Sequence, residues 1–253
     1  MPLLYNPLYT YFMNFSQHLA DAQAHLSTAD PRLSVIIAKY GNCTITPHTN
    51  YYEELVSSII SQQLSVKAAG TIWKRFIGMY ADKTPTPVQI LATDIEDIRK
   101  VGASYAKANY IKDLALHILD GELDLAHIAT LDNETIIAQL TAVKGIGEWS
   151  AHMFLIFSLG RLNVLPWGDL GVRKSMQEVY ELPTLPSKTE MIAVSEANKW
   201  SPYESVAAWY FWKNLDNKWC VYSKIGAMLS SASWAASTSL GELIIASIPE
   251  PFL

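Results

Sequence analysis

The chain contains 253 residues, of which half are hydrophobic and 17% are charged, and its formal net charge is -5. This apolar content excludes a disordered chain and is enough for a sizeable core in one large domain or two small ones. The negative net charge argues against a protein covered with positive charge, although residues 60–120 hold eight Lys or Arg against six Asp or Glu. A mildly basic middle between acidic flanks therefore permits binding to nucleic acid without predicting it.

The two cysteines, Cys43 and Cys220, lie far apart in the sequence and fit no metal-binding or disulfide pattern. This pattern favours a reducing compartment. The N-terminus does not join a basic end to an apolar run, so we expect no signal peptide. We expect the cytoplasm if the source is a bacterium and the nucleus if it is a eukaryote.

Helix signals recur along the chain, whereas the alternating pattern of strands is hard to find. The first clear helix begins after Asp30, a capping residue, with Pro31 in its first turn and Gly41 as its stop. Further helices are predicted, in chain order, over 51–63, over 65–80 after a break near Ser65, over 93–102 and 104–121, from a capping box at Ser187 to Glu190, and over 201–213 with Pro202 in its first turn. About ten short helices and no sheet predict an all-α fold.

From about residue 216 the composition changes to a segment rich in Ser and Ala, in which residues 226–240 are uncharged. A membrane span over this stretch is one alternative. Its many serines and small residues make it less apolar than inserted helices usually are, so we expect no membrane contact. Residues 216–253 are interpreted as a loosely attached or disordered tail of unknown role.

A glycine turn in the middle of the chain has the sequence VKGIGEW, beginning at Val143. One helix is predicted to end near Ala142 and the next to start near Gly147. Glycine permits positive φ and close approach of the backbone, so the amides of Gly145 and Gly147 could face an anion at a helix N-terminus, with Lys144 adding a charge. The alternative is a helical hairpin that needs glycine only to turn.

A single aspartate, Asp169, follows 22 residues after Gly147, in an apolar and aromatic neighbourhood. It is a predicted N-cap for a helix over 170–180. A carboxylate in such surroundings is also a candidate for stabilising positive charge in a reaction. The two roles are compatible.

The segments VKGIGEWSA and LPWGDLGVRK together resemble the pattern of the helix-hairpin-helix DNA glycosylase superfamily, and the similarity is greatest to the 3-methyladenine DNA glycosylase II branch and its fungal relatives. Three more segments resemble the family, in family order: IISQQLSVKAAGTIWKRF, VGASYAKANYIKDLA and WSPYESVAAWYFW. The resemblance covers roughly residues 50–213. It implies a glycosylase of residues 1–215, with two helical subdomains flanking a DNA-binding cleft: about 50–180, which contains the hairpin, and 1–49 plus 181–215.

The resemblance implies that Asp169 is the catalytic residue of a base excision repair enzyme. Breaking an N-glycosidic bond builds an oxocarbenium-like sugar, which a carboxylate stabilises, and the same group can orient water. Alkylated purines such as 3-methyladenine and 7-methylguanine are cationic and leave readily once flipped out of the duplex. Trp149 stands where strand-cleaving members have a Schiff-base lysine, which implies a monofunctional enzyme. Two distant cysteines cannot bind the iron–sulfur cluster of some relatives, and no cofactor is required.

Further residues match family positions that surround the substrate. The resemblance implies a base pocket lined by aromatic and apolar side chains that attract a cationic purine, namely Trp149, Tyr203, Met153 and Trp167. It implies an intercalating turn in which Gln63 or Leu64 fills the gap left by the base, beside Gln62 and Ser65. It implies a monovalent cation bound by the backbone carbonyls of Thr141, Val143 and Ile146. For each set the alternative is an ordinary packing or connecting role.

Two positions depart from the family pattern. Met153 stands where some relatives have tyrosine, and Glu204 stands where many have arginine, which puts the pocket shape and the affinity for DNA in doubt. Two other functions stay open: a non-catalytic helix-hairpin-helix module that only binds DNA, and a related glycosylase for oxidised or mismatched bases. The expected partner is double-stranded DNA with damaged bases, and the expected oligomeric state is a monomer.

Overall fold

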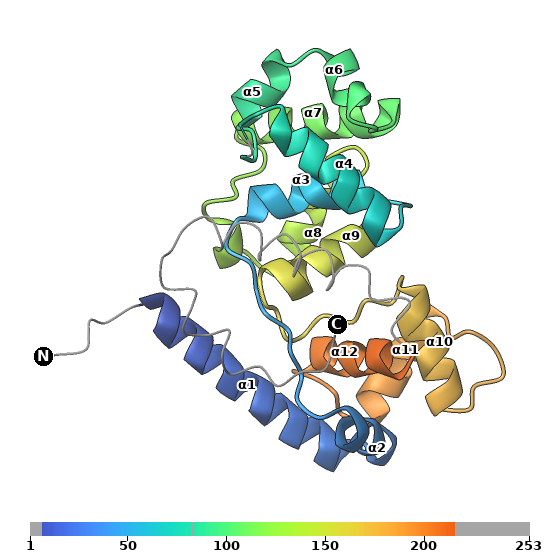
Figure 1. Ribbon diagram of the computed structural model, residues 1–253. Coiled ribbons are helices and arrows are strands. Elements are labelled where there is room, and N and C mark those ends of the chain that lie inside the picture. Colours follow the sequence, from blue (N-terminus) through green and yellow to red (C-terminus); the bar gives the residue numbers. More distant parts are fainter. Residues whose placement is uncertain (1–6, 82, 216–253) are drawn as a thin grey trace, which may run out of the picture.

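The computed structural model describes residues 7–81 and 83–215 (Figure 1). Regular structure in these ranges consists of helices, which confirms the predicted all-α fold. The tail 216–253, with Cys220, lies outside the described residues. The elements are α1 (Pro7–Ala29), α2 (Pro31–Tyr40), α3 (Tyr51–Ser61), α4 (Val66–Gly78), α5 (Pro87–Ala92), α6 (Ile95–Lys100), α7 (Tyr105–Leu119), η1 (Ile128–Thr130), α8 (Asn133–Ala142), α9 (Glu148–Met153), η2 (Phe154–Ser158), α10 (Leu170–Val179), α11 (Lys188–Ala197) and α12 (Glu204–Asn214).

The helices form two groups that are separated in Figure 1. In the first group α7 packs against α3, α5 and α6, while α9 packs against α8 and continues into η2, a single π-helical turn beside α3. In the second group α12 packs against α1, α2 and α10. The chain crosses between the groups over residues 41–50 and again over 159–169.

Helix α10 belongs to the second group, whereas the sequence analysis placed residues up to about 180 in the first. The reason is the small residues on one face of α10. Gly171 approaches the ring of Trp212, and the side-chain amide of Asn214 donates a hydrogen bond to the Ser175 hydroxyl at 3.3 Å. The boundary between the groups therefore lies before Asp169 rather than near 180.

Capping residues start the helices where the sequence predicts. The side chains of Asp30, Ser65 and Ser187 each accept a hydrogen bond from a backbone amide in the first turn, and Ser187 forms the predicted capping box with Glu190. The prediction that Pro202 lies in a first turn is wrong, because α12 begins only at Glu204. A turn in which the Tyr203 amide donates to the Trp200 carbonyl precedes the helix and delays its start.

The core extends through both groups and is rich in aromatic side chains at the second group. Trp200, Tyr210 and Phe211 are among its largest fully buried side chains. Four consecutive aromatic residues of α12, 209–212, are buried, which is why this helix lies at the centre of its group. Within the described ranges, no helix combines the length and apolarity needed to cross a bilayer.

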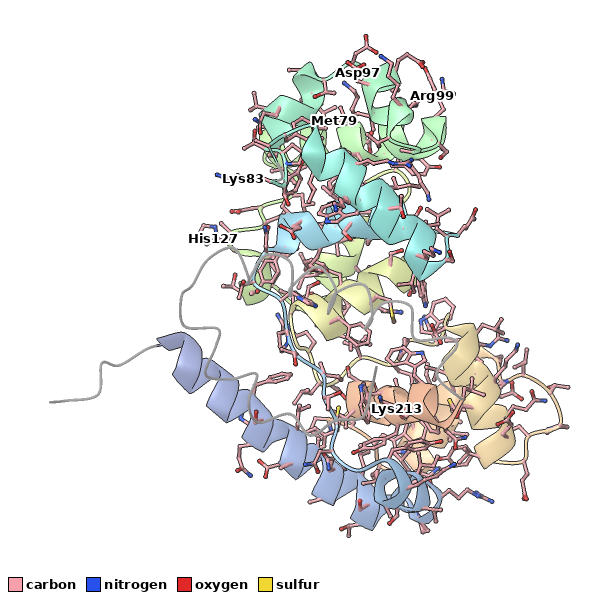
Figure 2. The ribbon with its side chains drawn as sticks, viewed as in Figure 1. Met79, Lys83, Asp97, Arg99, His127 and Lys213 are labelled. Carbon is pink, nitrogen blue, oxygen red and sulfur yellow. The ribbon has the colours of Figure 1, made fainter. Side chains whose placement is uncertain are left out.

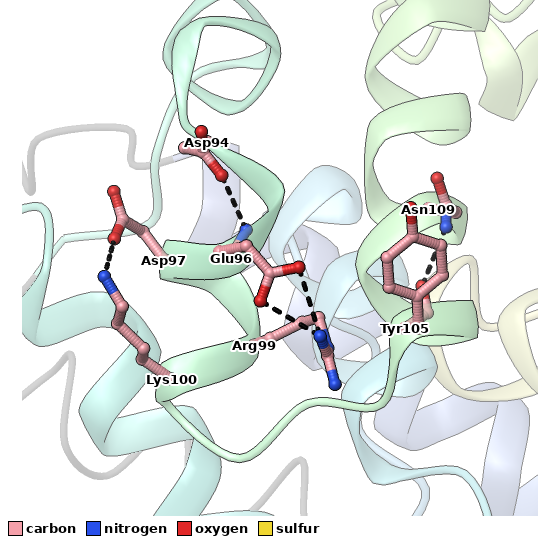
Figure 3. Close-up of polar contacts among 7 residues, drawn as sticks. All are labelled: Asp94, Glu96, Asp97, Arg99, Lys100, Tyr105 and Asn109. Atoms are coloured by element: carbon pink, nitrogen blue, oxygen red, sulfur yellow. Dashed lines mark hydrogen bonds and ion pairs between the residues drawn. The ribbon is translucent and has the colours of Figure 1, made fainter.

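At the far end of the first group, α6 is a short helix with charged side chains on its surface (Figures 2 and 3). Glu96 pairs with Arg99 at 2.9 Å and Asp97 pairs with Lys100 at 2.7 Å, while the Asp94 side chain caps the helix. Such exposed pairs stabilise a helix only slightly. They do, however, neutralise part of the positive charge counted over residues 60–120.

Candidate active site

Asp169 is the N-cap of α10, as predicted. Its Oδ1 accepts a hydrogen bond from the Val172 amide at 2.8 Å, and its own amide donates to the Pro166 carbonyl at 2.8 Å. The residue is 9% exposed. The turn 166–169 and the first turn of α10 thus fix both the backbone and one oxygen of this carboxylate.

Two tryptophans hold the Asp169 carboxylate from opposite sides. The indole of Trp149 donates from Nε1 to Oδ2 at 2.8 Å, and the indole of Trp212 donates from Nε1 to Oδ1 at 2.9 Å. Trp149 belongs to α9 in the first group and Trp212 to α12 in the second. The carboxylate therefore lies at the junction of the two groups, where three N–H donors orient it and the surrounding residues shield most of it from solvent.

Access to this carboxylate comes from the side of Trp149. Trp149 is 36% exposed, the neighbouring Leu170 is 42% exposed, and Gly168 is also exposed. Because Asp169 has two oxygens with about four lone-pair sites, three N–H donors leave room for one more partner. A water molecule or a sugar reaching past Trp149 could use it.

Trp212 was not predicted as a site residue, although it closes one of the family-like segments. Its position is set by Gly171, because a side chain at 171 would approach Trp212 Cδ1 to 3.3 Å and Asp169 Oδ1 to 3.0 Å. The motif WSPYESVAAWYFW pointed to the helix but not to the residue within it. The four consecutive aromatic residues of α12, 209–212, give no sign of which one donates to a carboxylate.

The predicted hairpin joins α8 to α9 over residues 143–147. Gly145 has φ +85°, and any side chain there would overlap the Tyr110 ring, so glycine is required on both counts. Gly147 is the N-cap of α9, and no atom would meet a side chain there. Lys144 is engaged by Asp113, which accepts from its backbone amide and from its Nζ, both at 2.8 Å. The surface beside Gly147 is therefore open, while Lys144 is already paired.

The predicted intercalating turn joins α3 to α4 over residues 62–65, which we call the α3–α4 turn. Gln63 is exposed with φ +57°, and Leu64 is half-buried. The Gln62 amide points back and donates to the Gly145 carbonyl at 2.8 Å, while Ser65 caps α4. Of these four residues, Gln63 and Ser65 are exposed, and Ser65 is engaged in capping α4, which leaves Gln63 available for contact.

Lys107, which the sequence analysis did not single out, holds the α3–α4 turn. Its Nζ donates to the carbonyls of Ile60 at 2.8 Å and Gln62 at 2.6 Å. Together with the bond from Gln62 to Gly145, these contacts tie the α3–α4 turn to the hairpin. The two expected DNA-contacting loops are thus one connected unit.

Met153 and Trp167, both predicted for the base pocket, lie in different places. Met153 is buried at 2% exposure and lines a small cavity between α3 and α9. Trp167 is half-buried, with the Lys188 ammonium 4.3 Å from its ring centroid.

The prediction that Tyr203 lines the same pocket as Trp149 is not supported by its position. Its ring packs against His25 of α1, with centroids 5.2 Å apart. Tyr203 precedes α12 and Trp212 is near its end, about 13 Å away at 1.5 Å per residue. Of the aromatic residues in this segment, Trp212 is therefore the one whose indole donates to Asp169.

Glu204, the acid found where many relatives have arginine, is tied to a neighbouring helix. Its Oε1 accepts a hydrogen bond from the Ser195 hydroxyl of α11 at 2.7 Å. The next residue, Ser205, is buried. Its hydroxyl accepts a hydrogen bond from the Val164 amide at 3.0 Å, which links α12 to the crossing segment 159–169. Glu204 therefore joins α12 to α11, at the end of α12 opposite Trp212.

Exposed positive charge near the α3–α4 turn lies on α4. Lys67, Lys74 and Arg75 are exposed on this helix, which begins directly after Ser65. Lys112, by contrast, donates to the carbonyls of Leu91 and Thr93. The positive charge available to a polyanion is therefore concentrated on one helix beside the turn.

Residues 56–201 match the family model described as HhH-GPD superfamily base excision DNA repair protein. DNA-3-methyladenine glycosylase 1 of Schizosaccharomyces pombe is 36% identical over 200 residues, which are 77% of this chain and 87% of the relative. The alkylbase DNA glycosidase-like protein mag2 of the same yeast is 33% identical over 76% of this chain and 92% of its own.

A solved structure of similar fold contains DNA. The S. pombe 3-methyladenine DNA glycosylase in complex with abasic DNA superimposes with a TM-score of 0.69 at 35% identity, covering 80% of this chain and 98% of that chain. A DNA-3-methyladenine glycosidase from Bacillus halodurans has the same TM-score at 36% identity, covering 76% of this chain and 88% of its own.

Proposed function

Because this chain belongs to the HhH-GPD superfamily of base excision DNA repair proteins, we propose that it is a monofunctional DNA glycosylase that removes alkylated purines from double-stranded DNA. The observation that supports this most strongly is the Asp169 carboxylate, oriented by Trp149, Trp212 and the Val172 amide at the junction of the two groups. Relatives 33–36% identical over about three quarters of the chain have names that refer to alkylbase or 3-methyladenine glycosylase activity.

The proposed reaction is hydrolysis of the N-glycosidic bond. The bond between C1′ and the base nitrogen breaks, the base leaves with the electron pair, and positive charge develops on the sugar. Asp169 stabilises that charge where it forms and accepts a proton from the attacking water as the water oxygen bonds to C1′, and this proton then passes to solvent. An alkylated purine already has a positive charge, so it leaves without a strong general acid.

A monofunctional reaction follows from the residue at position 149. An indole nitrogen cannot form a Schiff base with the sugar, and in this chain it donates its hydrogen to Asp169 instead. The product is an abasic site in an uncut strand. The alternative, a module that binds DNA without releasing a base, would need Asp169 only as a helix cap, and a cap does not require an acceptor site left open beside the exposed Trp149.

DNA contact is proposed through the hairpin, the exposed Gln63 of the α3–α4 turn and the basic face of α4. Gly147 leaves its surroundings open for a phosphate at the start of α9, and Gln63 can enter the stack when the base flips out.

We retain two further proposals: a monomer, and a monovalent cation at the carbonyls of Thr141, Val143 and Ile146. The Val143 carbonyl accepts the Ile146 amide at 3.1 Å and keeps a second lone pair for such an ion. A compartment that contains DNA is required, either bacterial cytoplasm or a nucleus.

The test is base release from methylated DNA. The protein is expected to release 3-methyladenine or 7-methylguanine, and Asp169→Asn is expected to lower the single-turnover rate by about 1000-fold, a magnitude typical for loss of one electrostatic group. Asparagine is also a good N-cap, its oxygen can keep the Val172 and Trp212 donors, and the indole of the exposed Trp149 can turn to water, so the melting temperature and DNA binding should change little.

Three other outcomes would contradict parts of the proposal. Release by Asp169→Asn at the wild-type rate would remove the assigned role of the carboxylate. Binding without release by the wild-type protein would favour the non-catalytic module. Strand cleavage before any heat or alkali treatment would exclude a monofunctional enzyme.

A further inference from the structure

Helix α7 carries three side chains that hold the two loops proposed to contact DNA. Lys107, Tyr110 and Asp113 follow one another at intervals of three residues, so they lie along one side of the helix. Lys107 binds the α3–α4 turn. The Tyr110 ring lies directly against Gly145 of the hairpin, and Asp113 binds the lysine next to this glycine. Helix α7 is therefore the support that both loops share.

The backbone of the α3–α4 turn adopts a conformation that its sequence does not favour. The Leu64 amide donates to the Ser61 carbonyl at 3.2 Å and closes a four-residue turn. Gln62 has φ -50° and ψ 131°, and Gln63 has φ +57°, as in a type II turn. The third position of this turn normally holds glycine or asparagine, because other side chains disfavour a positive φ. A contact from outside the turn is therefore needed to keep Gln63 in this conformation.

The half-buried Lys107 supplies that contact. Its ammonium donates to the Ile60 carbonyl at the end of α3 and to the Gln62 carbonyl, where the negative end of the helix dipole favours a cation. The Gln62 carbonyl belongs to the peptide group that joins Gln62 to Gln63. Fixing this peptide group restrains the φ rotation of Gln63. Lys107 thus holds the exposed side chain that is proposed to enter the base stack.

We propose that Lys107 is a positioning residue for base flipping, which holds Gln63 in the conformation that replaces the displaced base in the duplex. This inference rests on the proposed glycosylase function. It assigns the flipping step to Lys107, acting through Gln63, and leaves bond breaking to Asp169. A turn that is already ordered loses less conformational entropy when it enters the stack, so a larger fraction of the bound DNA is in the flipped state.

The experiment compares two duplexes that contain 7-methylguanine at one site, with the protein in excess and under single-turnover conditions. In one duplex the damaged base is paired with cytosine, and in the other it lies opposite an abasic site, so that no base pair has to be broken. Lys107→Met is expected to lower release from the paired duplex by about 10-fold, comparable with loss of one charge-assisted hydrogen bond. Release from the unpaired duplex should fall by less than about 3-fold, because flipping there needs less support from the protein.

The matched control is Lys112→Met. Lys112 is a half-buried lysine of the same helix, and its ammonium also donates to two carbonyls, those of Leu91 at 3.1 Å and Thr93 at 2.6 Å. These carbonyls lie where α5 ends and α6 begins, outside both DNA-contacting loops. Lys112→Met should lower the melting temperature about as much as Lys107→Met and leave both release rates unchanged. A loss confined to the paired duplex in Lys112→Met would overturn the proposal.

A second variant and a second measurement separate positioning from general stability. Lys107→Arg keeps a charge and two N–H donors, so its rates on both duplexes should stay within about 3-fold of the wild-type rates. Hydrogen exchange of the Leu64 amide, which closes the turn, should be about 10-fold faster in Lys107→Met and unchanged in Lys112→Met. Unchanged exchange in Lys107→Met would overturn the proposal, as would an equal loss of release from both duplexes or no loss from either.

If Lys107→Met does not fold, Gln62→Met gives the same comparison. This variant keeps the Gln62 carbonyl for Lys107 and removes the bond from the Gln62 amide to the Gly145 carbonyl, the other support of the turn. Release from the paired duplex alone should fall by about 3-fold, and an equal fall for both duplexes would overturn the proposal. If the wild-type protein releases the base from neither duplex, the glycosylase function itself fails. That result is distinct from a wild-type protein that is active and a Lys107→Met variant that matches it.

Discussion

Asp30 and Asp169 occupy similar positions in the second helix group, each at the start of a helix. Each is an N-cap, of α2 and α10 respectively, and each accepts hydrogen bonds from backbone amides of its helix. Each also accepts an indole N–H, because Trp200 donates to Asp30 at 2.8 Å as Trp212 donates to Asp169 at 2.9 Å.

The two carboxylates differ in their surroundings. Asp30 is fully buried, and its Oδ2 accepts both the Trp200 indole and the Tyr180 hydroxyl, while Oδ1 accepts two amides. Asp169 is slightly exposed beside Trp149, which is itself 36% exposed. Four donors satisfy Asp30 completely, whereas three donors leave Asp169 capacity for a substrate. Capping therefore explains why an aspartate stands at each position, and access to the carboxylate distinguishes the stabilising Asp30 from Asp169, for which we propose the catalytic role.

The largest effect expected within this comparison, after the loss of rate in Asp169→Asn, is the loss of stability in Asp30→Asn. The new amide cannot accept both the Trp200 and Tyr180 donors, so a buried N–H loses its partner. We expect a loss of about 3 kcal/mol in the free energy of unfolding and a melting temperature lower by roughly 10 °C. Denaturant unfolding measures the first and thermal unfolding the second.

The rate of base release per folded molecule should be unchanged in Asp30→Asn. An equal loss of stability in Asp169→Asn, or a loss of rate in Asp30→Asn, would break the distinction between the two residues.

A smaller effect is expected when the indole donor of Asp169 is removed. Trp212→Phe keeps an aromatic ring beside Phe157 but frees Oδ1 from one of its donors. The carboxylate should be less well oriented, and the single-turnover rate should fall by about 10-fold, comparable with loss of one charge-assisted hydrogen bond. The matched variant is Trp200→Phe, which removes the corresponding donor of Asp30 and should lower stability without changing the rate.

The smallest effect is expected when one methyl group is added to α10, at the position two residues after the aspartate. Arg32 occupies this position in α2 and Gly171 in α10. Gly171→Ala would place a carbon 3.0 Å from Asp169 Oδ1, so the carboxylate has to shift by a few tenths of an ångström. We expect a rate about 3-fold lower. The melting temperature should change little, because the gain of about 1 kcal/mol in helix propensity offsets the cost of displacing the carboxylate. A rate equal to that of the wild-type protein would show that the carboxylate tolerates this displacement.

Local signals in the sequence predicted much of the fold. Capping side chains and helix stops gave the starts of α2, α4 and α11 correctly, because these signals act over three or four residues. The long helix α1 was not predicted, although Asn6 and Pro7 in the sequence are the same kind of start signal as Asp30 and Pro31. The placement of α10 depended on which helix its small residues contact, and such a contact is not encoded in the local pattern.

The candidate site was predicted in its central residue and less well in its surroundings. Asp169 was identified by its position after the hairpin, and Trp149 by its position within it. Trp212 could not be identified, because four successive aromatics on α12 are equivalent by pattern and only their packing selects one. Tyr203 was assigned by resemblance, and its ring packs against His25 of α1.

The contacts of Lys107 and Gln62 have a mechanical consequence for the search along DNA. Since the α3–α4 turn and the hairpin are bonded to each other, they present a stiff ridge whose two parts keep a constant spacing. In the proposed DNA complex, a duplex pressed against this ridge is therefore expected to bend. Bending costs least where base stacking is already weakened. The protein would therefore stay longer at damaged base pairs than at intact ones before the base is released.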